Sequence, residues 1–260
     1  MTREPDLNSS TSQGASIRRV EGGVWRLEIP AGDNANYRLA QLDDTGGRLR
    51  KNFRWNPPLT LSIRARVSSP DIQGTWGFGL WNDPFSLSLG LGGGSRRFPV
   101  LPNAVWFFYG SLPNFLSIRD NMPAQGFLTQ VFRSVNIPPV ALAVGGMVLP
   151  FLSWPWMARR LRSVFRRFIR DRSFGLDMDL CQWHTYTLTW SEEMVSYQVD
   201  GTGVFESPLS PRYPLGLVIW IDNQYAAYPP NGDVSYGLLP STEPAWMEFN
   251  SLGLKRIDQD

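Results

Sequence analysis

The chain contains one cysteine and one histidine, and this scarcity excludes several kinds of site. Cys181 has no second cysteine with which to form a disulfide inside the chain. An ordinary zinc site of Cys and His ligands cannot be built from one of each, and a Ser-His-Asp or Cys-His arrangement would have to use His184. Because His184 lies in an alternating run of aromatic residues, we interpret it as structural.

Glutamate is missing from a long central part of the chain, between Glu28 and Glu192. The formal net charge is only +2, yet residues 159–172 hold seven arginines and one aspartate. This overall balance argues against a nucleic-acid partner, whereas the arginine-rich stretch indicates a local basic feature.

The N-terminal stretch lacks the basic, apolar and small-residue sections of a secretory signal. We therefore expect a cytoplasmic protein. Residues 1–18 are mostly small and polar, with four serines, and we expect them to be disordered.

Turn-forming and aromatic residues are abundant. The 260 residues include 24 Gly, 21 Pro and 11 Trp, and 42% of the chain is hydrophobic, a composition typical of a globular protein with many turns. Residues 59–67 alternate strictly between apolar and polar side chains, as a half-buried strand does. The pair Asp200-Gly201 indicates a tight hairpin.

We count roughly ten strands and predict a single all-β sandwich or jelly roll over residues 19–260. The clearest strands are expected at residues 24–29, 36–42, 59–67, 75–81, 105–109, 183–190, 194–199, 217–221 and 246–254.

Residues 135–172 break the strand pattern, and we interpret them as a helical insertion. Residues 134–158 carry no charge and include four prolines, and residues 159–172 show one apolar stripe at helical spacing. The segment is expected to form a lid, to dock on a membrane as well, or to contact another subunit. Its apolar lid residues are Trp154, Trp156, Leu161, Phe165 and Phe168, and its candidates for contact with an anionic group or membrane are Arg159, Arg160, Arg166, Arg167 and Arg170.

Two runs carry a resemblance to a known family. Residues 183–190 read W-H-T-Y-T-L-T-W and residues 195–201 read V-S-Y-Q-V-D-G, similar to a recurrent strand pair in family 16 glycoside hydrolases. The resemblance implies a concanavalin A-like jelly roll of two antiparallel sheets, one of them concave and carrying the ligand groove. It leaves a structural calcium open, since calcium is common in that superfamily; otherwise we expect no cofactor and no other metal.

The catalytic pattern of that family is missing. The family supplies its carboxylates from one strand with the pattern E-x-D-x-(x)-E, and the corresponding strand here, residues 104–109, reads A-V-W-F-F-Y. A retaining glycosidase needs two carboxyl groups about 5–5.5 Å apart. We therefore predict a sandwich that does not hydrolyse glycosides.

Strand alternation then selects groove residues. Trp220, Asp222 and Gln224 share one face. They are joined either by Trp76 and Phe78 or by Trp81, and on the next strand either by Trp106 and Phe108 or by Phe107 and Tyr109. The whole set of candidate ligand-binding residues is Trp76, Phe78, Trp81, Asn82, Trp106, Phe108, Trp220, Gln224 and Tyr225. Aromatic side chains on sandwich strands also serve as core, and that alternative stays open.

The first functional hypothesis is a protein that binds an apolar or lipid-like small molecule in this groove. The second is an isomerase or cyclase acting on a terpenoid-like substrate, with Asp222, Asp120 or Tyr109 as proton donor. A lectin-like carbohydrate-binding module and, last, a glycoside hydrolase remain alternatives. The sequence leaves the oligomeric state open.

Overall fold

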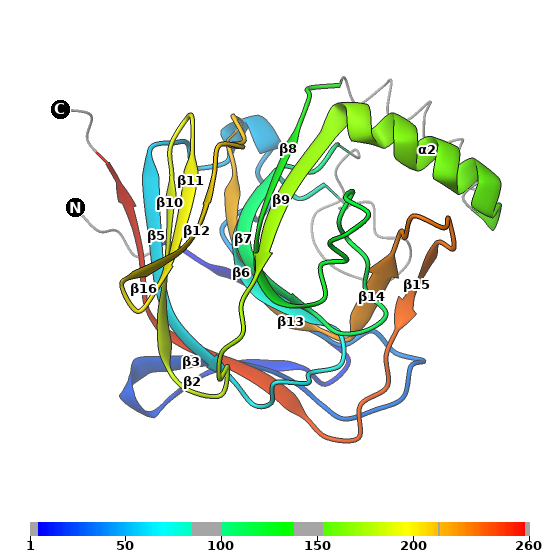
Figure 1. Ribbon diagram of the computed structural model, residues 1–260. Coiled ribbons are helices and arrows are strands. Elements are labelled where there is room, and N and C mark those ends of the chain that lie inside the picture. Colours follow the sequence, from blue (N-terminus) through cyan, green and yellow to red (C-terminus); the bar gives the residue numbers. More distant parts are fainter. Residues whose placement is uncertain (1–4, 85–99, 138–152, 213, 258–260) are drawn as a thin grey trace.

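The computed structural model describes residues 5–84, 100–137, 153–212 and 214–257. Two antiparallel sheets of seven strands each face one another as a sandwich (Figure 1), which confirms the predicted fold class. A third sheet pairs only β14 (Gln224–Ala227) with β15 (Ser235–Leu238).

In spatial order, sheet I consists of β1 (Asn8–Ser12), β4 (Leu39–Asp43), β13 (Gly216–Asp222), β6 (Thr75–Trp81), β7 (Ala104–Gly110), β8 (Gly126–Ser134) and β9 (Ile169–Gly175). Sheet II consists of β12 (Thr202–Ser207), β11 (Val195–Val199), β10 (His184–Trp190), β5 (Leu59–Val67), β16 (Ala245–Arg256), β3 (Val24–Ile29) and β2 (Ser16–Val20). Short 3₁₀ turns lie at Glu21–Gly23 and Arg50–Asn52.

The main core lies between the two sheets. The strict alternation of β5 sends Leu61, Ile63 and Ala65 into this core, as the pattern predicted. Two polar side-chain groups inside this core form hydrogen bonds. The Tyr197 hydroxyl donates to the Gln130 carbonyl oxygen at 2.9 Å, and Trp190 Nε1 donates to Ser210 Oγ at 3.0 Å.

The expected disorder of residues 1–18 is wrong for the part of this segment that the structure describes. Strand β1 extends sheet I by pairing with β4, and β2 extends sheet II by pairing with β3. Both are short edge strands, and their polar residues carry little of the apolar alternation by which a strand is recognised. Pairing with an existing sheet edge therefore decides their structure.

The helix of the predicted insertion occupies different residues from those expected. It is α2 (Pro155–Phe168), and residues 169–172 belong to β9, paired with β8. Pro155 stands at the first helical position, where a backbone N–H would have no partner within the helix. One of the four prolines in residues 134–158 therefore begins the helix. Residues 138–152 of the predicted insertion lie outside the described residues.

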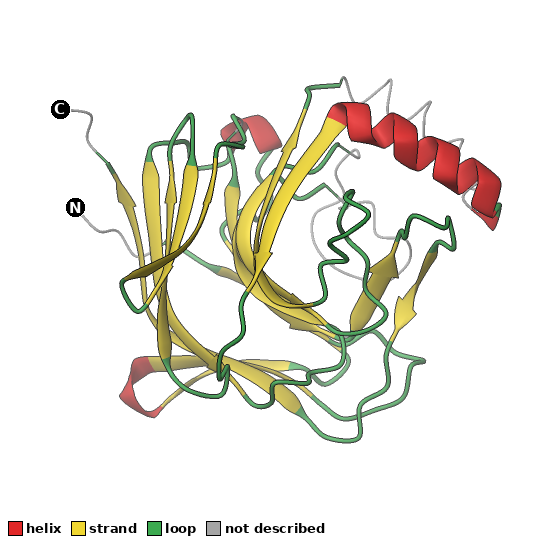
Figure 2. Ribbon diagram, viewed as in Figure 1, coloured by secondary structure: helices red, strands yellow, loops and turns green. Residues whose placement is uncertain are grey.

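Helix α2 lies on the side of sheet I that faces away from sheet II (Figure 1), and Figure 2 shows it as the one long helix drawn beside the yellow strands. The small β14–β15 sheet is found on the same side. This side of sheet I, called here the outer face, therefore carries additional structure over strands that already pack against sheet II.

Candidate functional site

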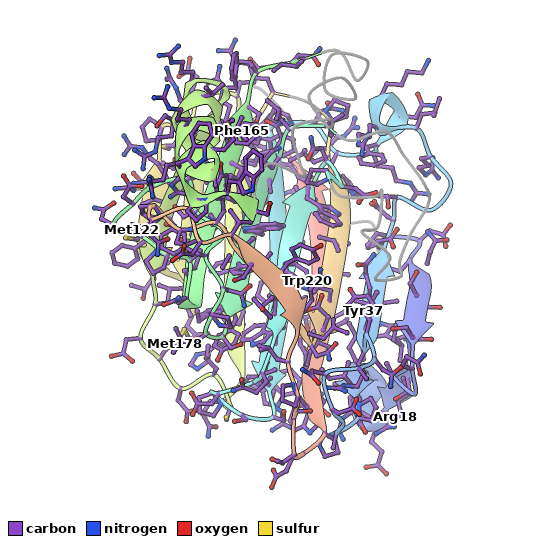
Figure 3. All side chains as sticks on the ribbon, turned by 90° about the vertical axis from the view of Figure 1, so that its right-hand side faces the viewer. Arg18, Tyr37, Met122, Phe165, Met178 and Trp220 are labelled. Atoms are coloured by element: carbon purple, nitrogen blue, oxygen red, sulfur yellow. The ribbon has the colours of Figure 1, made fainter. Side chains whose placement is uncertain are left out.

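The outer face of sheet I carries an apolar cluster of its own, separate from the core between the sheets. Trp106 on β7 lies at its centre. Its ring centroid is 5.5 Å from that of Trp220, 5.7 Å from that of Phe108, and 6.2 Å from those of Trp81 and Phe132. Figure 3 shows Trp220 near the middle of this face, with Tyr37 to one side and Phe165 of α2 above. We call Trp81, Trp106, Phe108, Phe132 and Trp220 the aromatic face.

Two glycines on β6 make room for these rings. Gly77 and Gly79 pair with Phe108 and Trp106 across the sheet, so they share the outer face with them. A Cβ at Gly77 would lie 2.8 Å from Cη2 of Trp220, and one at Gly79 would lie 2.5 Å from Cα of Trp106. The Trp220 ring therefore occupies space that a side chain at position 77 would fill, and the Trp106 backbone lies too close to position 79 for any side chain there.

The same alternation corrects two predicted ligand-binding residues. Trp76 and Phe78 point to the opposite face of β6 and lie in the core between the sheets. Trp76 stacks there on Tyr109, with centroids 5.5 Å apart, and Phe78 packs on Phe107 at 5.3 Å. The sequence T-W-G-F-G-L-W itself indicates this orientation. Alternate positions place large residues on one face of the strand and glycine on the other, up to Trp81.

The indole N–H groups of the aromatic face point to polar side chains of neighbouring strands. Trp106 Nε1 donates to Gln130 Oε1 at 3.1 Å, and Trp220 Nε1 donates to Thr75 Oγ1 at 2.9 Å. These bonds fix the two ring planes in position. Trp81 Nε1 is buried and has no hydrogen-bond partner among the described residues.

At one end of the aromatic face, Asp222 forms a buried polar cluster. Its Oδ1 accepts from Thr75 Oγ1 at 2.8 Å and from the Gln224 backbone N–H at 3.3 Å, and its Oδ2 accepts from the Tyr37 hydroxyl at 3.1 Å. Burial raises the pKa of Asp222 to about 6, although these hydrogen bonds act to lower it. Burial is also the main reason that the pKa of Tyr37 lies well above its usual value.

At the other end, three buried polar atoms lie side by side on β8 and β9. Gln130 pairs directly with Ser173, and Asp171 is the next residue of β9 on that face. Gln130 Nε2, Asp171 Oδ1 and Ser173 Oγ have no hydrogen-bond partner among the described residues. The other Asp171 oxygen accepts from Ser117 Oγ at 2.5 Å, and burial raises the pKa of this carboxyl. Together they offer a donor, an acceptor and a hydroxyl beside Trp106.

The three candidate proton donors do not come together. Asp222 lies on the outer face, whereas Tyr109 lies in the core between the sheets, where burial raises its pKa to about 12. Asp120 is half-exposed in the loop after β7 and binds Arg162 and Arg166, and the Arg166 hydrogen bond is the main cause that lowers its pKa. Of the three, Asp222 is the one next to the aromatic face.

Four further residues singled out in the sequence are placed as follows. Asn82 bridges two backbone segments, since its Oδ1 accepts from the Asn103 N–H at 3.0 Å and its Nδ2 donates to the Leu101 carbonyl at 2.9 Å. Gln224 and Tyr225 belong to β14, outside sheet I, and are partly exposed. His184 is held at both ring nitrogens, by Asp200 at 2.7 Å and by the Asp179 carbonyl at 3.0 Å.

The inward side of α2 is centred on an arginine, which the sequence did not predict. Arg162 is only 3% exposed and donates to the backbone carbonyls of Ser117, Arg119 and Tyr228 as well as to Asp120 Oδ1. Phe165, one turn along, packs against the aromatic cluster and meets Tyr228 edge to face at 6.3 Å. Leu161 is partly buried, whereas Trp154, Trp156 and Phe168 are exposed.

The arginines named as candidates for an anionic group have different surroundings. Arg159 donates to the Asn231 carbonyl at 3.0 Å, and Arg166 donates to the Ile118 carbonyl at 3.0 Å and pairs with Asp120. Arg160 and Arg167 are exposed on α2, and Arg170 is exposed on β9.

Sequence reasoning missed Tyr37, Gln130, Asp171, Ser173 and Arg162. Strand β8 reads F-L-T-Q-V-F and is largely apolar on both faces. This pattern indicates a central strand and could have identified β8 from the sequence. Asp171 was missed because residues 159–172 fit one continuous arginine-rich helix, and Ser173 directly follows that stretch. Only the pairing of β9 with β8 separates them from it.

Within the described ranges, no group of three or more His, Cys, Asp or Glu side chains is arranged to hold a metal ion. None of the described helices is long and apolar enough to cross a membrane.

Comparison with known proteins finds no matching family model and no matching curated sequence. Among solved structures, the β-glucanase of Bacillus licheniformis superposes with a TM-score of 0.51 at 8% identity, over 97% of this chain and 92% of that one. LamAcat from Zobellia galactanivorans gives a TM-score of 0.48 at 13% identity, over 91% of this chain and 79% of that one.

A structure described as a pseudo β-1,3-glucanase of Mycobacterium tuberculosis gives a TM-score of 0.47 at 13% identity, over 91% of this chain and 76% of that one. At such identities the likeness to the Bacillus enzyme shows the fold alone. The chain has the concanavalin A-like jelly roll found in family 16 β-glucanases.

We expect Gly77→Ala to destabilise the protein by roughly 1–3 kcal/mol, because the new methyl group meets the Phe107 carbonyl oxygen and the Trp220 ring. Chemical denaturation followed by tryptophan fluorescence measures the change. The matched control is Gly203→Ala on β12, where a Cβ meets no atom within 4 Å. Equal stabilities of the two variants would show that the packing of the Trp220 ring does not require glycine at position 77.

A second prediction concerns Asp222 and the pH dependence of the unfolding free energy. Its pKa in the folded protein, about 6, lies above that of an unfolded aspartate, so the folded state holds the proton more tightly. Its contribution is therefore most favourable below pH about 4 and is lost as the pH rises through about 6, by roughly 2–3 kcal/mol.

Asp222→Asn removes this decline from the curve of unfolding free energy against pH. Tyr37→Phe deletes a hydrogen bond to the ionised carboxyl and so raises the pKa of Asp222 further. The decline of the unfolding free energy then extends to higher pH and becomes larger. Parallel curves for wild type and Asp222→Asn between pH 4 and 7 would contradict the assignment.

Proposed function

We propose that the aromatic face binds an organic ligand with a mainly apolar surface and that the protein does not hydrolyse glycosidic bonds. The observation that carries the proposal is the outer face of β7, where Trp106 and Phe108 stand on the strand that the family resemblance assigns to catalytic carboxylates.

The carboxylates of sheet I support the second half of the proposal by their spacing. Its strands place Asp43, Asp171 and Asp222 on the outer face, each on a different strand. From β13 to β9 there are four strand intervals, and the two residues are also about six positions apart along the strands, so Asp171 and Asp222 are more than about 19 Å apart. Asp43 pairs with Val218, four residues from Asp222, which separates those two by about 13 Å. Glycosidases need carboxyl groups within about 5–9.5 Å.

The chemistry of the face favours a ligand with an apolar body and a polar end. The indole and phenyl rings present apolar surface, and polar side chains border it around Asp222, around Gln130 and, on β4, at Gln41 and Asp43. Pockets for small organic molecules commonly combine such an apolar lining with a few polar groups that fix orientation. Trp106 and Trp220 are only 8% exposed, so entry of a ligand requires the covering segments, which include Phe165 of α2, to move.

The test is a titration of intrinsic tryptophan fluorescence with farnesol, which has an apolar chain and one hydroxyl, and in parallel with a laminarin oligosaccharide. We expect saturable quenching by farnesol and a loss of affinity of about ten-fold or more in Trp106→Ala, because a buried aromatic surface is removed. The control is Trp183→Ala, which changes a partly exposed tryptophan beside Arg64 of β5 in sheet II and leaves the affinity unchanged. Binding of the oligosaccharide alone, or release of reducing sugar from it, would overturn the proposal in favour of a carbohydrate function.

A second candidate is an isomerase or cyclase acting on the same kind of ligand. Asp222 favours it, because a carboxyl group with a pKa of about 6 exchanges protons near neutral pH. If so, Asp222→Asn binds the ligand with little change and abolishes its conversion, as followed by gas chromatography of extracted terpenoid alcohols. Conversion at the wild-type rate in Asp222→Asn, or no conversion by wild type, would exclude this role for Asp222.

A further inference from the structure

Helix α2 docks onto the protein along one side only. Ala158, Arg162 and Phe165 recur every three or four residues on that side, and the first two are buried. Besides the Arg162 bonds, the Tyr228 hydroxyl donates to the Ala158 carbonyl at 2.6 Å. The helix is therefore fixed to the body of the protein by this side, and its other side is presented to the surroundings.

The presented side carries large apolar residues. Trp154 and Trp156 are 51% and 50% exposed at the start of the helix, and Val164 and Phe168 are 44% and 37% exposed further along. A short helix rarely leaves so much apolar surface in water without a partner. Trp in particular is enriched where an apolar phase meets water, because its ring is apolar and its N–H is polar.

The same side is also strongly basic. Helix α2 contains five arginines and no acidic residue. Arg160 and Arg167 are exposed on the presented side, between the apolar residues. The nearby carboxylate, Asp120, binds Arg162 and Arg166 and lies at the edge of the docked side. The presented side therefore combines apolar anchors with two arginines that form no ion pair with an acidic residue in the described part of the chain.

We propose that α2 docks the protein on the surface of a membrane that contains anionic lipids. Arginine side chains meet the lipid phosphates, and Trp154, Trp156 and Phe168 enter the boundary between headgroups and acyl chains. The 14 residues of α2 extend about 21 Å, less than the thickness of a bilayer core, so the helix lies in the plane of the interface. The exposed apolar residues distinguish a lipid surface from a nucleic acid, whose phosphates would need the arginines alone. This docking does not depend on the ligand proposed above.

Vesicle flotation tests the docking. The full chain is mixed with vesicles of phosphatidylcholine, with or without about 30% phosphatidylserine, at low salt. We expect it to float with the anionic vesicles and to stay with the soluble fraction when phosphatidylserine is omitted. At about 1 M salt the bound fraction decreases, because screening removes the contribution of the arginines.

Matched variants separate the two contributions. Arg160→Gln combined with Arg167→Gln lowers the partition coefficient roughly twenty- to thirty-fold, and Trp156→Ala lowers it by a further factor of about ten. The controls are Lys255→Gln and Met194→Ala, an exposed charge and an exposed apolar residue on sheet II strands or their turns, and both bind vesicles as wild type does. Near-ultraviolet circular dichroism verifies that each variant is folded.

A measurement on the unaltered protein provides the independent arm. Brominated phosphatidylcholine, mixed with the anionic lipid, quenches the fluorescence of tryptophans that reach the acyl-chain boundary, and we expect such quenching for the wild type. Failure of the wild type to float with anionic vesicles would overturn the proposal. So would equal binding by all the α2 variants, or binding to duplex DNA without binding to vesicles.

Discussion

Sheet I buries apolar side chains on both of its faces, and the other features of the molecule depend on this constraint. On β7, alternate residues divide between the core, with Phe107, and the aromatic face, with Trp106 and Phe108. A face of that kind cannot remain in water, so it requires either covering segments or a ligand. The glycines of β6 and the hydrogen bonds of the Trp106 and Trp220 N–H groups are arranged around it.

Arg162 connects the cover to this face. One buried guanidinium bonds to the carbonyls of the 117–119 loop and of Tyr228, and it thereby holds α2 where Phe165 can reach the aromatic cluster. Its hydrogen bonds go to backbone carbonyls and to one half-exposed aspartate. They connect segments that are distant in sequence. The same helix presents its opposite side outward, so we propose two roles for one element, covering the aromatic face and contacting a membrane.

The sandwich could be predicted because strict alternation, as in residues 59–67, leaves little choice of structure. Which side chains of each aromatic strand point to the outer face could not be predicted, because Trp76 and Trp106 both lie in runs that are apolar on both sides. Asp222 was identified because its strand could be oriented from the sequence alone. The start of α2 at Pro155 and the edge strand of residues 8–12 depend on contacts made only in three dimensions.

The central claim is that the aromatic face receives a ligand and is not merely a second closed core. An experimental structure of the protein, purified from the cells that naturally produce it, tests this most directly. The account predicts a non-protein molecule in contact with the Trp106 and Trp220 rings, with its polar end toward Asp222 or toward Gln130. Rings packed only against side chains of this chain, in protein that also releases no small molecule on denaturation, would contradict it.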